Sequence, residues 1–366
     1  MENLKENTVS MIFAAIDKSI ISEIPKLEEV ENRGADYVAW GENNLAPEFL
    51  FDLYKNVTTL STIIEALSDY ASGENARCNI SGFENQMNRR GDSIEDIIKW
   101  LVRDYLLYGC AAVQVVRDKV GRISEVYYVD MRCLRTDKKN QAFYYSEEYA
   151  KKWARRNKVL VYPAYVPDAI DIPSSILFIK NNITYSYGMP IYTSAFKDCL
   201  IEKRIEEMHL NSLSNNFMAS YIINFNNGIP TDETKAELER NIFEKFCGTE
   251  NAGRVILNFA NGKDNGAEVQ KLDVTDFADR YNAAAARSRE QIYAAFRVIP
   301  AVVGVLPEVT GFNSIEFQQA FKLINKTVVR PLQTKISNMF DKLFQTQGAI
   351  SIEPFSIEYN TEETVR

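Results

Sequence analysis

The chain has 366 residues, a formal net charge of −8 at pH 7, 46% hydrophobic residues and 25% charged residues. This composition is ordinary for a folded globular protein, and the length is enough for two domains or for one body with a large projection. No apolar run approaches the roughly 18–20 residues that cross a bilayer, so no membrane span is expected. Lys and Arg are spread along this acidic chain, which argues against tight electrostatic wrapping of a nucleic acid but not against loose contact.

The residue types that build metal centres and catalytic triads are scarce. Five cysteines, an odd number without close pairs, predict reduced thiols of a cytoplasm-like environment, and residues 1–20 lack the pattern of a secretory signal. His209 is the only histidine and lies in a helical stretch. Residues 261–266 (NGKDNG) lack the first glycine of a phosphate loop and are typical of a hairpin turn. We therefore expect no catalytic residue, cofactor site or metal site.

The first half of the chain predicts a mixed α/β body. Residues 1–60 are hard to interpret, but residues 61–73 predict a helix that Gly73 stops. Residues 91–109 predict a second helix, in which Ser93 and Asp96 resemble a capping box. Strands follow as a hairpin over 110–130 and as two runs, 159–167 and 174–181. We interpret the basic helix 149–158 between them as a solvated face, although contact with an acidic partner is the alternative.

The second half predicts two long helices that carry a small unit. Residues 190–217 form the first helix, with proline in its first turn, and residues 275–296 form the second. Between them, strand, helix, strand and strand patterns predict a β-α-β-β unit. The second helix contains four consecutive alanines, which let neighbouring helices approach closely and also favour helix by propensity alone.

An apolar, proline-punctuated stretch, residues 296–317 (FRVIPAVVGVLPEVTGFNSIEF), interrupts this helical region. After it, apolar residues at three- and four-residue spacing predict one helix over 314–344, about 45 Å long. Pro331 removes one backbone hydrogen bond inside it and should kink it. Residues 349–360 alternate as a closing strand. A helical hairpin with a small head cannot bury all of its apolar faces alone, which favours side-by-side copies in a ring.

Four stretches resemble portal proteins of tailed bacteriophages, of the type found with HK97-like capsids. They are 94–130 (a helix, Tyr-Gly, and two strands), 187–196 (YGMPIYTSAF), 248–262 (GTENAGRVILNFANG) and 288–340 (SREQIYAAFRVIPAVVG through VVRPLQTKISNMF). Their order matches the layout above. Arg297 stands where the family often has Gly, Ile299 where it often has Pro, and Asn313 precedes Ser314 where the order is often reversed.

The resemblance implies an α+β portal-like fold and a division of the chain. The expected parts are a wing (1–190), two stem helices (191–218 and 276–297) carrying a clip (219–275), a tunnel loop (298–313), a long kinked helix returning to the wing (314–344) and a closing strand or short crown (345–366). The tunnel loop would line a DNA channel with non-adhesive side chains, and stem helices would pack between subunits. The residues expected in these roles are Val302, Val303, Val305, Leu306 and Phe312 in the loop, and Ala284 and Ala285 in the stem.

The family further implies a non-enzymatic ring of twelve at one capsid vertex, assembled in the host cytoplasm, through which double-stranded DNA is packaged and ejected. Its expected partners are the terminase large subunit, head-completion or adaptor proteins and the major capsid protein. Two alternatives remain open on the residues alone. One is a helical scaffold or adaptor without a channel, and the other is a packaging ATPase or nuclease, which the missing phosphate loop and the lone histidine disfavour.

Overall fold

The computed structural model describes residues 30–31, 36–151, 158–214, 221–225, 255–259, 274–305 and 314–355. The chain forms two compact units. The larger unit contains residues 24–200 and 289–366, and the smaller contains residues 1–23 and 201–288. The mixture of helices and sheets confirms the expected α+β class.

Helices α3 (Thr58–Ser72) and α4 (Ile94–Tyr108) pack against each other in the core of the larger unit. The predicted capping box of α4 is confirmed, because Ser93 Oγ accepts from the Asp96 amide at 3.1 Å and the Ser93 amide donates to Asp96 Oδ2 at 3.1 Å. Gly109 ends α4 at φ 76°, and a Cβ there would lie 2.4 Å from the Met189 carbonyl oxygen. Only glycine fits this left-handed and crowded position.

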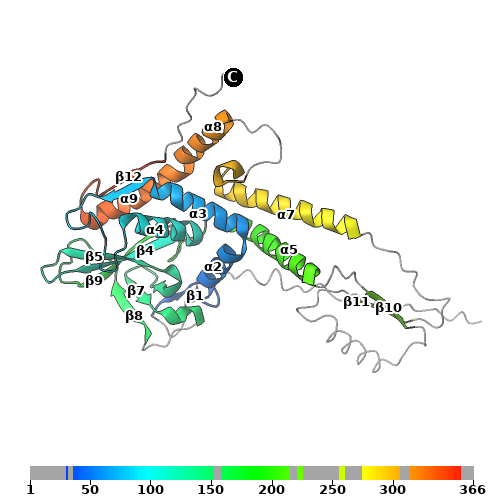
Figure 1. Ribbon diagram of the computed structural model, residues 1–366. Coiled ribbons are helices and arrows are strands. Elements are labelled where there is room, and N and C mark those ends of the chain that lie inside the picture. Colours follow the sequence, from blue (N-terminus) through cyan, green and yellow to red (C-terminus); the bar gives the residue numbers. More distant parts are fainter. Residues whose placement is uncertain are drawn as a thin grey trace, which may run out of the picture. The chain divides into compact units, whose positions relative to one another are not determined.

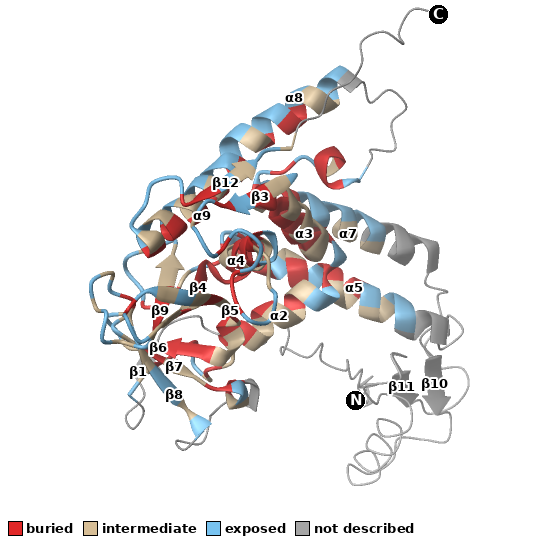
Figure 2. Ribbon diagram, turned by 60° about the vertical axis from the view of Figure 1, so that its left-hand side comes forward, coloured by how far each residue is buried: buried red, intermediate tan, exposed pale blue. Residues whose placement is uncertain are grey.

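Two antiparallel sheets stand beside these helices. The predicted hairpin is β4 (Cys110–Arg117) with β5 (Ile123–Val129), and β9 (Ser174–Lys180) pairs with the other edge of β4. A second sheet has the order β6 (Leu134–Thr136), β7 (Ala142–Tyr145) and β8 (Leu160–Pro163), of which only β8 was expected. Most of the predicted basic helix over 149–158 lies outside the described residues. Figure 2 shows the buried residues gathered in α3, α4 and β4.

The opening stretch of the described chain contributes α2 (Ala46–Asn56) and two short strands, β1 (Val30–Glu31) and β2 (Val38–Ala39). The predicted closing strand is β12 (Ile350–Glu353), which pairs antiparallel with β3 (Asn75–Cys78), so that Ile350 stands opposite Cys78. This pairing joins positions that are far apart in the sequence: Figure 1 shows β12 next to α9, and Figure 2 shows it beside β3.

The long helix over 314–344 consists of three parts. They are α8 (Ser314–Ile324), a π-helical turn (Asn325–Val329) and α9 (Arg330–Phe344). The Arg330 amide donates to the Asn325 carbonyl, five residues back, instead of to the usual fourth. The interruption therefore precedes Pro331, which lies in the first turn of α9, directly after the π-helical turn.

The smaller unit holds most of α5 (Phe196–Ser214) and of α7 (Val274–Phe296) and two short strands. Helix α5 corresponds to the helix predicted over 190–217. It begins at Phe196, after a 3₁₀ turn over Thr193–Ala195, rather than at Pro190. Strands β10 (Tyr221–Phe225) and β11 (Val255–Phe259) pair in parallel, with Ile223 opposite Leu257. A parallel pair needs a crossover connection, which agrees with the helix predicted between them over 231–248. That helix lies outside the described residues, as does the strand predicted over 267–274 except for its last residue, Val274, which begins α7.

Within the described part of the chain, no helix combines the length and apolar character that a membrane crossing needs. No group of three or more His, Cys, Asp or Glu side chains in that part is placed to hold a metal ion.

Candidate functional site

The stretch that interrupts the helical region begins where α7 ends in a left-handed turn. The Val298 amide donates to the Tyr293 carbonyl at 3.1 Å, and the Arg297 amide donates to the Ala294 carbonyl at 3.0 Å. This pair of bonds is a Schellman motif, in which the residue at the turn takes positive φ. Arg297 has φ 57°, which explains physically why glycine suits this position. Tyr293 and Val298, which such motifs bring into apolar contact, are both buried.

A second stop of the same kind follows within seven residues. The 3₁₀ turn Pro300–Val303 ends at Gly304, which has φ 86°. The Val305 amide donates to the Pro300 carbonyl at 3.1 Å, and the Gly304 amide donates to the Ala301 carbonyl at 3.3 Å. Two successive left-handed turns thus fix the direction in which the chain leaves at Val305. We call residues 293–305 the loop base.

Tyr70 of α3 anchors the loop base. Its hydroxyl donates to the Val302 carbonyl at 2.6 Å, across 232 positions of sequence. Its ring packs edge-on against Phe321 of α8 at 5.5 Å and against Phe355 at 5.7 Å. Burial, with a smaller contribution from Asp69, raises the pKa of Tyr70, so its hydroxyl stays protonated and able to donate at neutral pH.

A glutamine joins α9 to the same place. The Gln333 amide nitrogen donates to the carbonyls of Tyr70 at 3.4 Å and Ala71 at 3.3 Å, close to the end of α3. Carbonyls in the last turn of a helix lack partners within the helix, so this side chain satisfies groups that would otherwise need water. The loop base, α8 and α9 therefore all contact the last turns of α3.

The expected site residues differ in how far the structure buries them. Val302 and Val303 are 2% and 8% exposed and belong to the chain's own core, whereas Val305 is 44% exposed. Leu306 and Phe312 lie outside the described residues. In the smaller unit, Ala284 and Ala285 are partly exposed. The channel-lining and subunit-packing roles of all these residues stay predictions.

Sequence reasoning missed Tyr70, whose partner is remote in the sequence and leaves no local pattern. It did note that Arg297 replaces a common glycine, and that departure marks the left-handed turn. His209, the lone histidine, is exposed on α5.

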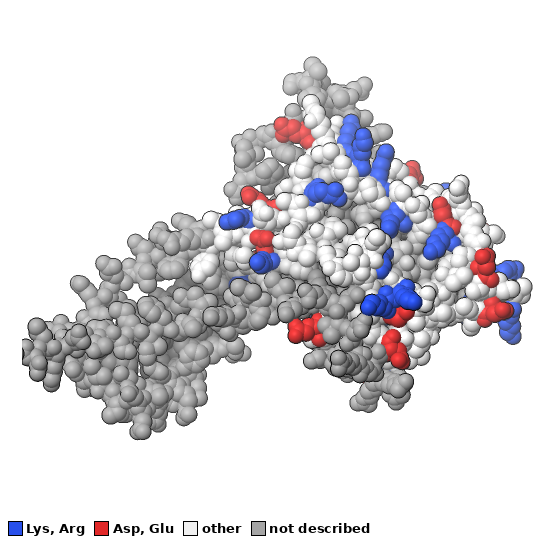
Figure 3. Space-filling view, turned by 180° about the vertical axis from the view of Figure 1, so that it is seen from behind, with Lys and Arg blue, Asp and Glu red and all other residues white. Residues whose placement is uncertain are grey.

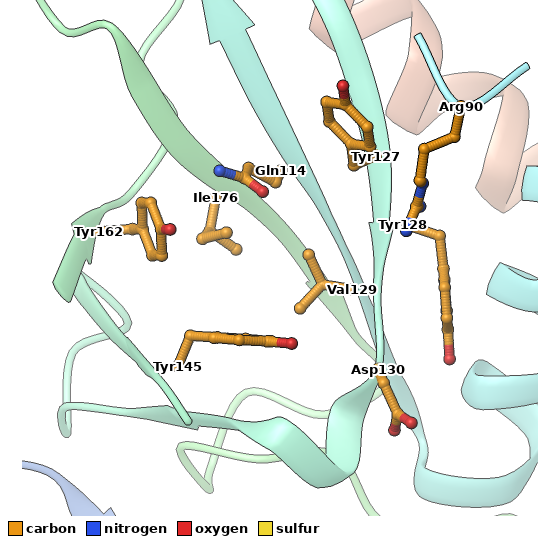
Figure 4. A pocket seen from close by; sticks show the side chains of 9 residues that line it. All are labelled: Arg90, Gln114, Tyr127, Tyr128, Val129, Asp130, Tyr145, Tyr162 and Ile176. Atoms are coloured by element: carbon orange, nitrogen blue, oxygen red, sulfur yellow. The ribbon is translucent and has the colours of Figure 1, made fainter. Parts of the chain in front are cut away.

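A second candidate lies between the two sheets of the larger unit (Figure 4). This cleft has a volume of about 340 Å³ and is lined by Arg90, Gln114, Tyr127, Tyr128, Val129, Asp130, Tyr145, Tyr162 and Ile176. Figure 4 shows Tyr145 and Tyr162 reaching into it from β7 and β8. Arg90 lies over the Tyr127 ring at 5.0 Å, and Asp130 is paired with Arg132 at 2.6 Å. The lining offers aromatic surface and charge but no nucleophile beside a general base.

Behind β5, the chain buries a carboxyl group. Tyr128 donates its hydroxyl hydrogen to Asp104 Oδ2 at 2.7 Å, and Arg103 donates to the Tyr128 hydroxyl at 2.9 Å. Burial raises the pKa of Asp104 to about 7, although Arg103 opposes the shift. This cluster ties α4 to β5, and its geometry is that of a structural network.

Comparisons with known proteins support the portal resemblance. The family model described as phage portal protein matches residues 84–366. An uncharacterized protein of Rickettsia bellii (strain RML369-C) is 28% identical over 211 residues, which are 54% of this chain and 52% of that protein. The match thus spans about half the length of this curated relative.

Two solved structures share the fold at low identity. One is described as the virion of a native gene transfer agent particle, with a TM-score of 0.52 and 16% identity over 83% of each chain. The other is described as the neck of the native particle computed with C12 symmetry, with a TM-score of 0.52 and 16% identity over 91% of this chain and 87% of that one.

The family match covers well over half of the sequence and includes most of the larger unit and all of the loop base. Portal proteins are structural components of particles, so the expectation of a non-enzymatic protein is confirmed on that ground. The chain belongs to the phage portal protein family.

Proposed function

We propose that the chain is the subunit of a ring, of twelve copies, at one capsid vertex, through which double-stranded DNA is packaged and ejected. The observation that carries this proposal is the family match over residues 84–366. The similarity in fold to a neck structure of C12 symmetry supports the ring. The terminase large subunit, head-completion proteins and the major capsid protein are the proposed partners, and the host cytoplasm is the proposed place of assembly.

Within such a ring, residues 298–313 are the proposed channel-facing segment. The two left-handed turns and the Tyr70 bond hold its first residues, in which Val298 and residues 301–303 are buried, whereas Ile299 and Val305 are exposed. Val302 and Val303 pack within the chain, and the lining role therefore rests on Val305, Leu306 and Phe312. Apolar side chains suit a surface along which DNA must slide, because they form no ion pairs with phosphates.

The proposed stem helices are residues 191–218 and 276–297, and the proposed clip is residues 219–275. The acidic balance of the chain agrees with a bore that repels the duplex rather than gripping it. In this arrangement the parallel strands β10 and β11 belong to the clip, which would face the packaging motor and later the head-completion proteins.

Mass photometry and negative-stain microscopy of the purified full chain test the proposal. We expect a ring of about twelve copies with a central hole, formed by the chain alone or on co-expression with its capsid protein. Particles no larger than a monomer or dimer under both conditions would favour the adaptor without a channel. Nucleotide hydrolysis by the purified chain, absent from a matched mock preparation, would favour the packaging enzyme.

A further inference from the structure

The long helix carries an unbalanced row of positive charge. Residues 317–340 contain four basic residues and neither Asp nor Glu, in a chain whose net charge is −8. Lys322, Lys326 and Arg330 are exposed and follow one another at intervals of four, so they share one side of the helix. We call these three residues the basic face. In Figure 3, Lys and Arg side chains gather in the upper part of the molecule, where Figure 1 places α8 and α9.

Among the residues that the structure describes, no acidic side chain forms an ion pair with the basic face. Like charges at intervals of four destabilise a helix by a few tenths of a kcal/mol per pair. An acidic segment laid along the basic face would remove this repulsion and gain attraction. The face therefore favours a negatively charged occupant.

A groove adjoins the basic face at Arg330 and extends along α9. It has a volume of about 400 Å³ and lies between α9 and β12, with a lining of Arg330, Gln333, Thr334, Ser337, Ile352 and Pro354. The chain itself runs past this groove, because β12 ends at Glu353 and Pro354 is part of the lining. The next residue, Phe355, packs against Tyr70, whose ring also contacts Phe321 of α8. The course of the chain is thus from α9 toward α8.

The residues that follow have the required charge. Residues 356–366 read SIEYNTEETVR and contain three glutamates and one arginine. Eleven extended residues span about 36 Å, whereas the eight helical steps from Lys322 to Arg330 cover about 12 Å. The segment is therefore long enough to follow the basic face from its exit at Phe355.

We propose that residues 356–366 dock along the basic face of their own chain, with Glu358, Glu362 and Glu363 paired with Lys322, Lys326 and Arg330. Each exposed ion pair is weak by itself. The docking is intramolecular, however, and tethering at Phe355 gives the segment a high effective concentration at the face. The contact would tie α8, the helix that follows residues 306–313, to the last residues of the sequence. It does not depend on the proposed ring.

Zero-length carbodiimide coupling of the full chain, read by peptide mass spectrometry, tests the docking. The reagent joins a lysine amine to a carboxylate only in contact, and the Lys99–Asp69 pair, at 2.5 Å, is the internal positive control. We expect links from Lys322 and Lys326 to the three glutamates. In an equal mixture of ¹⁴N- and ¹⁵N-labelled protein, each link should join peptides of the same label.

Charge reversal supplies the second test. Reversing the charge of the basic face should raise the amide exchange rate of residues 356–366 several-fold; the triple variant is Lys322→Glu, Lys326→Glu and Arg330→Glu. Reversing the segment as well should return exchange to the wild-type rate; the added changes are Glu358→Lys, Glu362→Lys and Glu363→Lys. Lys342→Glu, an exposed change on α9 outside the face, is the matched control and should leave exchange unchanged.

Three results would each overturn the proposal. One is the absence of segment links while Lys99 couples to Asp69, and another is links that join differently labelled copies, which would assign the segment to a neighbouring subunit. The third is a combination of two observations: the charge-reversed variant loses binding to duplex DNA, and the wild type shows no cross-link between residues 356–366 and the basic face. This result would assign the basic face to a nucleic acid instead.

Discussion

Replacing Tyr70 by phenylalanine isolates the single bond that holds the loop base to α3. The ring contacts with Phe321 and Phe355, at 5.5 and 5.7 Å, remain because phenylalanine keeps the ring. What is lost is the 2.6 Å hydrogen bond to the Val302 carbonyl. Val302 is 2% exposed, so water replaces the hydroxyl poorly and the carbonyl is left without a donor. The expected loss is about 1–2 kcal/mol of local stability.

Amide exchange measures this loss where it occurs. A change of 1–2 kcal/mol corresponds to roughly 5- to 30-fold faster exchange at the amides of Gly304 and Val305, if opening of the loop base limits their exchange. The matched control is Tyr185→Phe, because Tyr185 is 41% exposed and its hydroxyl makes no hydrogen bond within the described residues. Equal exchange at the loop base in the wild type and in Tyr70→Phe would refute the anchoring role.

Three other changes have defined outcomes. Arg297→Gly should stabilise the larger unit by about 1 kcal/mol in urea unfolding, because glycine adopts the left-handed turn at φ 57° without strain; a loss of stability would contradict this. The pKa of Asp104 is raised from 3.8 to about 7, so the folded state binds more protons between these pH values, and stability should fall by at most about 3 kcal/mol from pH 5 to pH 8. Asp104→Asn should flatten that slope, and an unchanged slope would remove Asp104 as its source. Ala284→Asp should weaken subunit association in mass photometry if this residue faces a neighbour, and undiminished rings would show that it does not.

The elements that the sequence predicts well are those with local chemical signals. The capping box at Ser93 and the stop at Gly109 bound α4 correctly, because both depend on residues within one helical turn. The β4–β5 hairpin is equally local. By contrast, β6 and β7 are only three and four residues long, too short for alternation to be recognised. Their turn does carry a signal, since Asp137 Oδ1 accepts from two amides and Asn140 has φ 55°.

In the candidate site, too, the features set by neighbouring residues were predicted, and the contacts between distant residues were not. The apolar, proline-punctuated pattern of residues 296–317 predicts an interruption between two helices, and the structure has a 3₁₀ turn there, at Pro300–Val303. No local pattern could assign Tyr70 to the Val302 carbonyl, because the pairing spans the whole fold. The π-helical turn was also beyond prediction: Pro331 indicates that one bond is missing, but not whether the helix bends there or widens beforehand.

A channel-facing segment needs a defined point at which it leaves the fold and a suitable set of side chains, and in this chain different residues provide the two. Two left-handed turns and one buried hydroxyl bond fix where the chain departs, and none of them involves a residue beyond Val305. Substitutions at Leu306 or Phe312 can therefore change the proposed lining without altering the point of departure, whereas substitutions at Tyr70 or Gly304 change the departure and leave the lining intact. A variant of each class, compared for ring formation and for DNA retention, distinguishes a segment that acts by its surface from one that acts by its position.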